Sequence, residues 1–71
     1  MKRYEALEKY QMLLLELEKL FDSLLEYREV IEDIKGVNGD TRSMEVDWDL
    51  RYMQYETRRE AVFEFGKSLG V

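Results

Sequence analysis

The sequence contains no cysteine, no histidine and no proline, and it has only four glycines among 71 residues. The absence of cysteine excludes disulfides and thiolate metal sites. The absence of histidine removes the commonest general base and the commonest metal ligand. A chain of this size buries only about 60% of the surface that its unfolded form exposes, so it needs another source of stability. We therefore expect one domain, residues 1–71, that is stabilised by self-association or by a partner.

Long apolar runs and clusters of positive charge are also missing. The longest apolar run, residues 12–15, is far too short to span a membrane. Sixteen acidic residues against eleven basic ones give a net charge of −5, which opposes binding to a phosphate backbone or to an anionic membrane surface. We expect a cytoplasmic protein with no membrane partner and no direct nucleic-acid partner.

The first half of the chain has the pattern of one long amphipathic helix. Residues 3–35 contain no glycine and are dominated by leucine, glutamate, lysine, methionine and glutamine, which are good helix formers. Apolar residues recur at alternating steps of three and four, and a second apolar row runs beside them. This pattern predicts a helix of about 33 residues, roughly 50 Å long, whose apolar face is wider than a two-stranded coiled coil requires.

Residues 36–42 are the predicted loop. Gly36 is the expected left-handed residue that ends the first helix. The dipeptide Asn38-Gly39 is a strong turn signal.

The segment "MEVDWDLRY", residues 44–52, alternates apolar and polar side chains, which is the period of a half-buried strand. A strand at 44–50 has no partner in this chain, and it would have to pair with another molecule to satisfy its backbone. The alternative is a helix over about 43–68 with Thr41 or Ser43 as its N-cap. We favour the helix and keep the strand as the second interpretation.

The predicted fold is therefore all-α, a helical hairpin of two long antiparallel helices at about 3–35 and 43–68. Two helices cannot cover so broad an apolar face, whereas two hairpins paired about a two-fold axis can. We expect a homodimeric four-helix bundle. The residues predicted for its core or dimer interface are Tyr10, Leu13, Leu17, Leu20, Leu24, Tyr27, Ile31, Ile34, Val62 and Phe65.

Carboxylates are the only side chains that offer any chemistry. Glu26, Glu29, Glu32 and Asp33 follow one another at helical spacing, a pattern that loosely resembles the magnesium-binding acids of the all-α nucleotide pyrophosphohydrolases. That resemblance implies a metal-dependent hydrolase fragment as a third functional class. A solvated helix face explains the same acids better, and no serine has a histidine or a nearby lysine as its base. We predict a non-enzymatic protein with no catalytic, metal or cofactor site.

A candidate surface for a protein partner surrounds the alternating segment, because Trp and Tyr are enriched in binding hot spots. Its predicted members are Asp40, Glu45, Asp47, Trp48, Asp49, Tyr52 and Tyr55. In an extended chain Glu45, Asp47 and Asp49 would lie about 6.8 Å apart, close to the spacing of phosphates in a nucleic-acid strand. Small acidic proteins of phages and mobile elements use such surfaces to block host enzymes, and an inhibitor of that class is the alternative prediction. The leading prediction is a self-associating interaction module that binds an unidentified protein.

Overall fold

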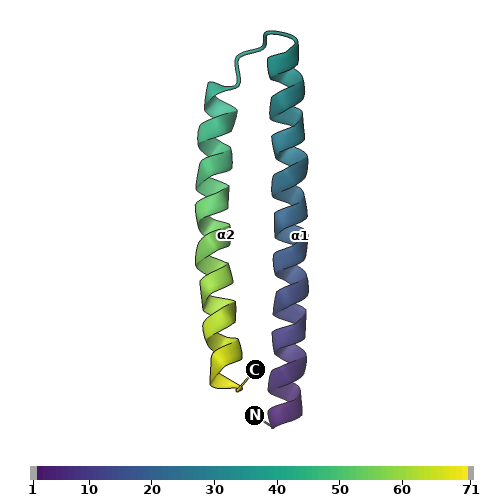
Figure 1. Cartoon of the computed structure of the whole chain (residues 1–71), viewed down its shortest axis with the longest axis vertical. Helices are drawn as coiled ribbons and strands as arrows, with labels where there is room; N and C mark the ends of the chain where they lie inside the picture. The colour runs from purple at the N-terminus through teal and green to yellow at the C-terminus, as the bar shows by residue number, and fades with distance from the viewer. Residues whose placement is uncertain (1, 71) are drawn as a thin grey trace.

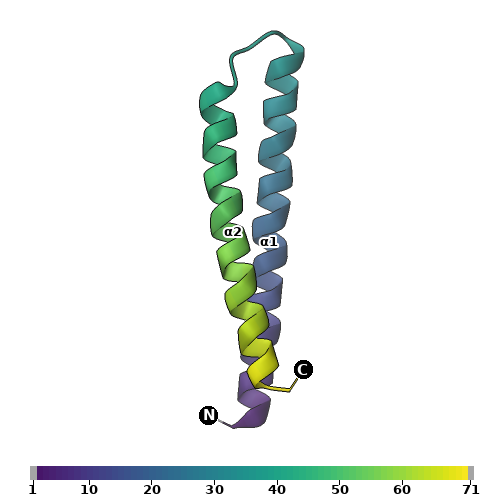
Figure 2. The ribbon, with the colours of Figure 1, turned by 60° about the vertical axis from the view of Figure 1, so that its left-hand side comes forward.

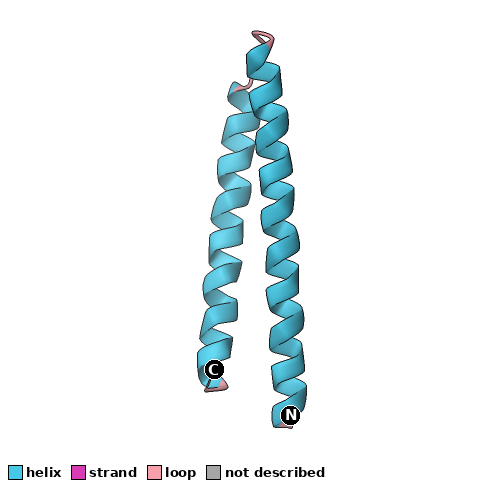
Figure 3. Ribbon diagram, turned by 45° about the vertical axis from the view of Figure 1, so that its right-hand side comes forward, coloured by secondary structure: helices cyan, strands magenta, loops and turns pink. Residues whose placement is uncertain are grey.

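The structure, a computed structural model that describes residues 2–70, is an all-α helical hairpin (Figure 1). Helix α1 spans Arg3–Gly36 and helix α2 spans Arg42–Ser68, which agrees with the predicted bounds to within one residue. The two helices run antiparallel, with the N- and C-termini at the same end (Figure 1). The views in Figures 2 and 3 show that their axes are inclined to one another.

The hairpin is a rod rather than a sphere. Its principal extents are 54 × 15 × 15 Å and its radius of gyration is 16.3 Å, whereas a compact domain of this length has a radius of gyration of about 11 Å. An elongated two-helix rod exposes much of its apolar surface.

The strand interpretation of residues 44–50 is wrong, because α2 begins at Arg42 and no part of residues 2–70 forms a strand. The helix satisfies the backbone of this segment internally, whereas a lone strand would leave it unpaired. Trp48 of this segment lies against α1, where its indole N–H donates a hydrogen bond to the Leu24 carbonyl oxygen, 2.8 Å away. Val46 and Leu50 remain 61% and 55% exposed.

The turn that ends α1 differs from the predicted one. Gly36 is still helical, and the left-handed residue is Asn38, with φ of 62°. The Asn38 amide donates to the Lys35 carbonyl, and the Gly39 amide donates to the Ile34 carbonyl over 2.8 Å, which together form a Schellman motif. A Cβ atom at Gly39 would collide with the Ile34 side chain, so this turn needs glycine at position 39.

One of the two predicted N-cap candidates, Thr41, is the N-cap residue of α2, but the side chain that binds a free amide there is that of Asp40. The Thr41 hydroxyl makes no capping bond and instead donates to Glu45 Oε2 over 3.4 Å. The Asp40 carboxylate accepts the Arg42 backbone N–H over 3.1 Å. Asp40 therefore satisfies one of the free amides at the helix start.

The core is a single row of side chains between the two helices. Ala6, Leu17, Leu24 and Ile31 of α1 and Val62 of α2 are buried, and Ile31 is the one large side chain with no exposed surface among residues 2–70. Twelve large apolar side chains in the same range remain at least 36% exposed. The hairpin thus buries only the centre of the apolar face.

Candidate protein-interaction site

The residues predicted for the core or a dimer interface divide into two groups. Leu17, Leu24, Ile31 and Val62 are buried between α1 and α2. The others are half-buried and lie at the edges of the contact between the helices: Tyr10, Leu13, Leu20, Tyr27, Ile34 and Phe65. In addition to the twelve more exposed apolar side chains, the hairpin leaves this half-buried group as incompletely covered apolar surface.

Most of that surface lines a groove along one side of the hairpin. Two adjoining cavities, of about 210 and 390 Å³, share Leu20 and Arg58. We call their combined lining the interhelical groove. The lining consists of Lys9, Leu13, Glu16, Leu17, Leu20, Ser23, Leu24 and Tyr27 from α1 and of Arg51, Gln54, Tyr55, Arg58, Ala61, Val62 and Phe65 from α2. Its floor is apolar and its rims carry charge.

Aromatic and charged side chains interlock at the loop-proximal end of the groove. The Tyr27 hydroxyl donates to Asp47 Oδ2 over 2.9 Å, and Arg51 Nε donates to the same oxygen over 3.0 Å. The Arg51 guanidinium lies 5.2 Å from the centroid of the Tyr27 ring. Desolvation and the Asp47 carboxylate raise the pKa of Tyr27, because both favour the neutral phenol. The contacts among Tyr27, Asp47 and Arg51 hold α1 against α2 near the loop.

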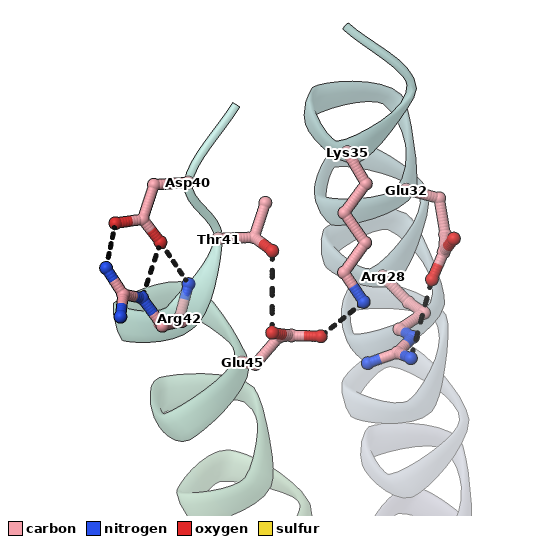
Figure 4. Close-up of polar contacts among 7 residues, drawn as sticks. All are labelled: Arg28, Glu32, Lys35, Asp40, Thr41, Arg42 and Glu45. Atoms are coloured by element: carbon pink, nitrogen blue, oxygen red, sulfur yellow. Dashed lines mark hydrogen bonds and ion pairs between the residues drawn. The ribbon is translucent and has the colours of Figure 1, made fainter. Parts of the chain in front are cut away.

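Two acids of the predicted partner surface are paired within the hairpin (Figure 4). Asp40 accepts two bonds from the Arg42 guanidinium, which lower the pKa of Asp40. Glu45 forms an ion pair with Lys35 of α1, and the hydrogen bond from Lys35 lowers the pKa of Glu45. These carboxylates join the loop and the two helices, and their charge is balanced locally.

The aromatic members of the predicted surface also have partners within the hairpin. Trp48 stacks on Tyr52 with ring centroids 5.3 Å apart, and the Arg28 guanidinium lies 5.4 Å from the Trp48 centroid. Tyr55 packs on Phe21 at 5.6 Å. Trp48 therefore makes contacts to both helices within the hairpin.

The acidic row expected from an extended segment does not form. Glu45, Asp47 and Asp49 lie two residues apart on α2, so each projects about 200° around the helix from the one before. Glu45 forms an ion pair with Lys35, and Asp47 accepts a hydrogen bond from Tyr27. Asp49 is exposed.

The carboxylates of α1 that resembled a magnesium site lie on the surface. Glu26, Glu29, Glu32 and Asp33 are all exposed, and Glu32 pairs with Arg28 at 3.4 Å. No group of three or more potential metal ligands occurs within residues 2–70. The acids of α2 at this height, Glu45 and Asp47, pair with Lys35, Tyr27 and Arg51 instead.

Sequence reasoning missed the basic rim of the groove. Arg59 is exposed and pairs with Glu56 at 3.7 Å. Arg58 instead lies in the groove at the junction of its two cavities. The sequence does contain a sign of the α2 side of the groove. Arg51, Arg58 and Phe65 recur every seven residues, beside the row of α2 that faces α1.

Comparison with known protein families, curated proteins and solved structures gave no match to this chain. Among residues 2–70, neither helix has the length and apolar character needed to cross a membrane.

Proposed function

We propose that the chain is a non-enzymatic protein-interaction module, that the interhelical groove is its binding surface, and that self-association of two hairpins is the interaction it makes there. The observation that carries this proposal is the open, apolar-floored groove along a rod with a core one side chain deep. Leu13 and Leu20 line these cavities and are only half-buried in the hairpin, and covering them would be favourable.

The accessible surface gives the size of the missing contact. A compact monomer of 8.6 kDa exposes about 4,700 Å², whereas this chain exposes 5718 Å². The excess of about 1,000 Å² is close to the area of roughly 800 Å² that each partner contributes to a standard interface. One partner seated along the groove would therefore give the chain the surface of a compact protein.

Sedimentation equilibrium across a range of protein concentrations tests the proposal. We expect the apparent mass to approach twice 8.6 kDa as concentration rises. Leu20→Glu places a charge at the centre of the groove and should leave the protein monomeric. Leu15→Glu is the matched control, because Leu15 is 51% exposed on the same helix and lies outside the groove.

A second groove variant guards against misfolding of the first. Ala61 lines the groove but is exposed in the hairpin, so Ala61→Glu should block association while circular dichroism shows unchanged helicity. A wild-type protein that stays monomeric at every concentration would overturn self-association. Equal association of the Leu20→Glu and Leu15→Glu proteins would show that the groove is not the binding surface.

A further inference from the structure

Two hairpins can cover each other's grooves in two ways. If the two-fold axis runs parallel to the helices, both loops lie at the same end and α1 of each hairpin packs against α2 of the other. If the axis runs across the helices, the loops lie at opposite ends and each helix packs against its own copy. Both arrangements give antiparallel neighbours throughout the bundle.

We propose that the occupant of the groove is a second copy of this chain in the same-end arrangement. The proposal rests on the proposed function and specifies the geometry of the same surface. It is argued from the charges on the two rims of the groove.

An acid on the α1 rim of the groove lies beside a base on the α2 rim. Glu16 and Arg58 line the same cavity, and neither has an ion-pair partner within residues 2–70. Lys9 also lines this cavity, nearer the start of α1. The rim of α1 is therefore acidic at Glu16, where the rim of α2 is basic at Arg58.

The same-end arrangement brings these rims together. When α1 faces α2 of the partner, Glu16 meets Arg58 of the other copy. The two-fold axis repeats this pairing. Opposite charges then face each other along both edges of the interface, which favours this register.

The opposite-end arrangement places like charges together. Arg58 is shared by both cavities and therefore marks the middle of the groove. An axis crossing the groove at its middle would bring Arg58 of one copy against Arg58 of the other, and it would leave Glu16 without a base. Like charges brought together at an interface disfavour the complex.

Electron spin-label distances distinguish the two arrangements. The chain has no native cysteine, so a single label can be attached at Val37→Cys, a loop position that is 78% exposed. The hairpin is 54 Å long and 15 Å wide. The same-end arrangement predicts a label-to-label distance within about two hairpin widths, whereas the opposite-end arrangement predicts about one hairpin length.

A label at Lys19→Cys separates the geometry from association itself. Lys19 lies midway along α1 and is exposed, so both arrangements give it a short distance. A short Lys19 distance with a long Val37 distance would overturn the same-end proposal alone. The absence of any intermolecular distance at Lys19 would overturn the self-association on which it rests, including the case in which a different protein fills the groove.

A charge change at the centre of the groove gives an independent test. In the same-end arrangement Arg58→Gln removes two ion pairs from the dimer, and we expect the dissociation constant to rise about tenfold. The opposite-end arrangement predicts tighter association, because the substitution removes a repulsion. Arg59→Gln is the matched control, since Arg59 pairs with Glu56 outside the groove, and it should leave the dissociation constant unchanged. Tighter binding of the Arg58→Gln protein would overturn the proposal.

Discussion

Replacing Ile31 with alanine should remove much of the stability of the hairpin. Ile31 is the one large side chain with no exposed surface in the described part of the chain. The substitution deletes three carbon atoms, worth about 0.8 kcal/mol each when buried, and leaves a cavity beside them. Alanine returns about 0.4 kcal/mol through its higher helix propensity. The net loss should be about 2–3 kcal/mol.

Val30→Ala is a suitable control, because Val30 precedes Ile31 on α1 and is 48% exposed. Its smaller transfer loss is offset by a gain in helix propensity of about 0.6 kcal/mol, so the free energy of unfolding should change by less than about 0.5 kcal/mol. Urea titrations read by circular dichroism and by the fluorescence of Trp48 measure both variants. The slope for a protein this small is about 1 kcal/mol per molar urea, so the midpoint of the Ile31→Ala protein should fall by about 2–3 M.

The result that would refute this reasoning is an equal shift for Ile31→Ala and Val30→Ala, since burial would then not decide the cost. All titrations should use one protein concentration, because association would couple stability to it. If the Ile31→Ala protein is too unstable to show a folded baseline, Ile31→Val is the milder substitution, with an expected loss of about 1 kcal/mol.

Three further predictions concern the turn and its neighbouring contacts. Asn38→Ala should cost about 1 kcal/mol in thermal or urea unfolding because alanine resists the left-handed conformation, whereas Asn38→Gly should cost less; equal losses would contradict this account of the turn. Lys35 lowers the pKa of Glu45 below its ordinary 4.5, so that contribution to stability is present above pH 4.5 and is lost as the pH falls through the lowered value. Acid titration of Glu45→Gln should therefore show a shallower loss of helicity than wild type. Because the pKa of Tyr27 is raised, the stability contributed by its neutral phenol is present below the ordinary pKa of 10.0 and is lost as the pH rises through the raised value. Tyr27→Phe should therefore remove a late phenolate step from the absorbance titration.

The helices and their bounds could be predicted from the sequence because local signals and the apolar period agree. An uninterrupted run of helix formers spans α1, and the loop glycines separate it from α2. The decision at residues 44–50 rested on backbone hydrogen bonding rather than on side-chain pattern, since alternation alone favours a strand. An unpaired strand would cost more than exposing Val46 and Leu50 on a helix.

The details of the turn and groove depend on contacts between segments that the sequence pattern does not encode. Gly36 looked like the left-handed cap because it is the first glycine in the sequence after the run of helix formers, yet the close approach to Ile34 reserves glycine for position 39. Asparagine tolerates the left-handed conformation, so Asn38 can take that role. Arg58 and Arg59 are adjacent and chemically identical, and only the register of α2 against α1 puts one in the groove and the other on the surface.

The packing of α2 against α1 also affects the alternative prediction, an acidic surface that mimics a nucleic acid. An evenly spaced row of Glu45, Asp47 and Asp49 would require α2 to unwind over residues 44–50. Unwinding would break the bond from Trp48 to Leu24 and the bond from Tyr27 to Asp47, which lie on opposite sides of the contact with α1. It would also separate Glu45 from Lys35. The folded hairpin therefore uses these residues to hold its helices together, and the interhelical groove is the surface at which we propose that a partner binds.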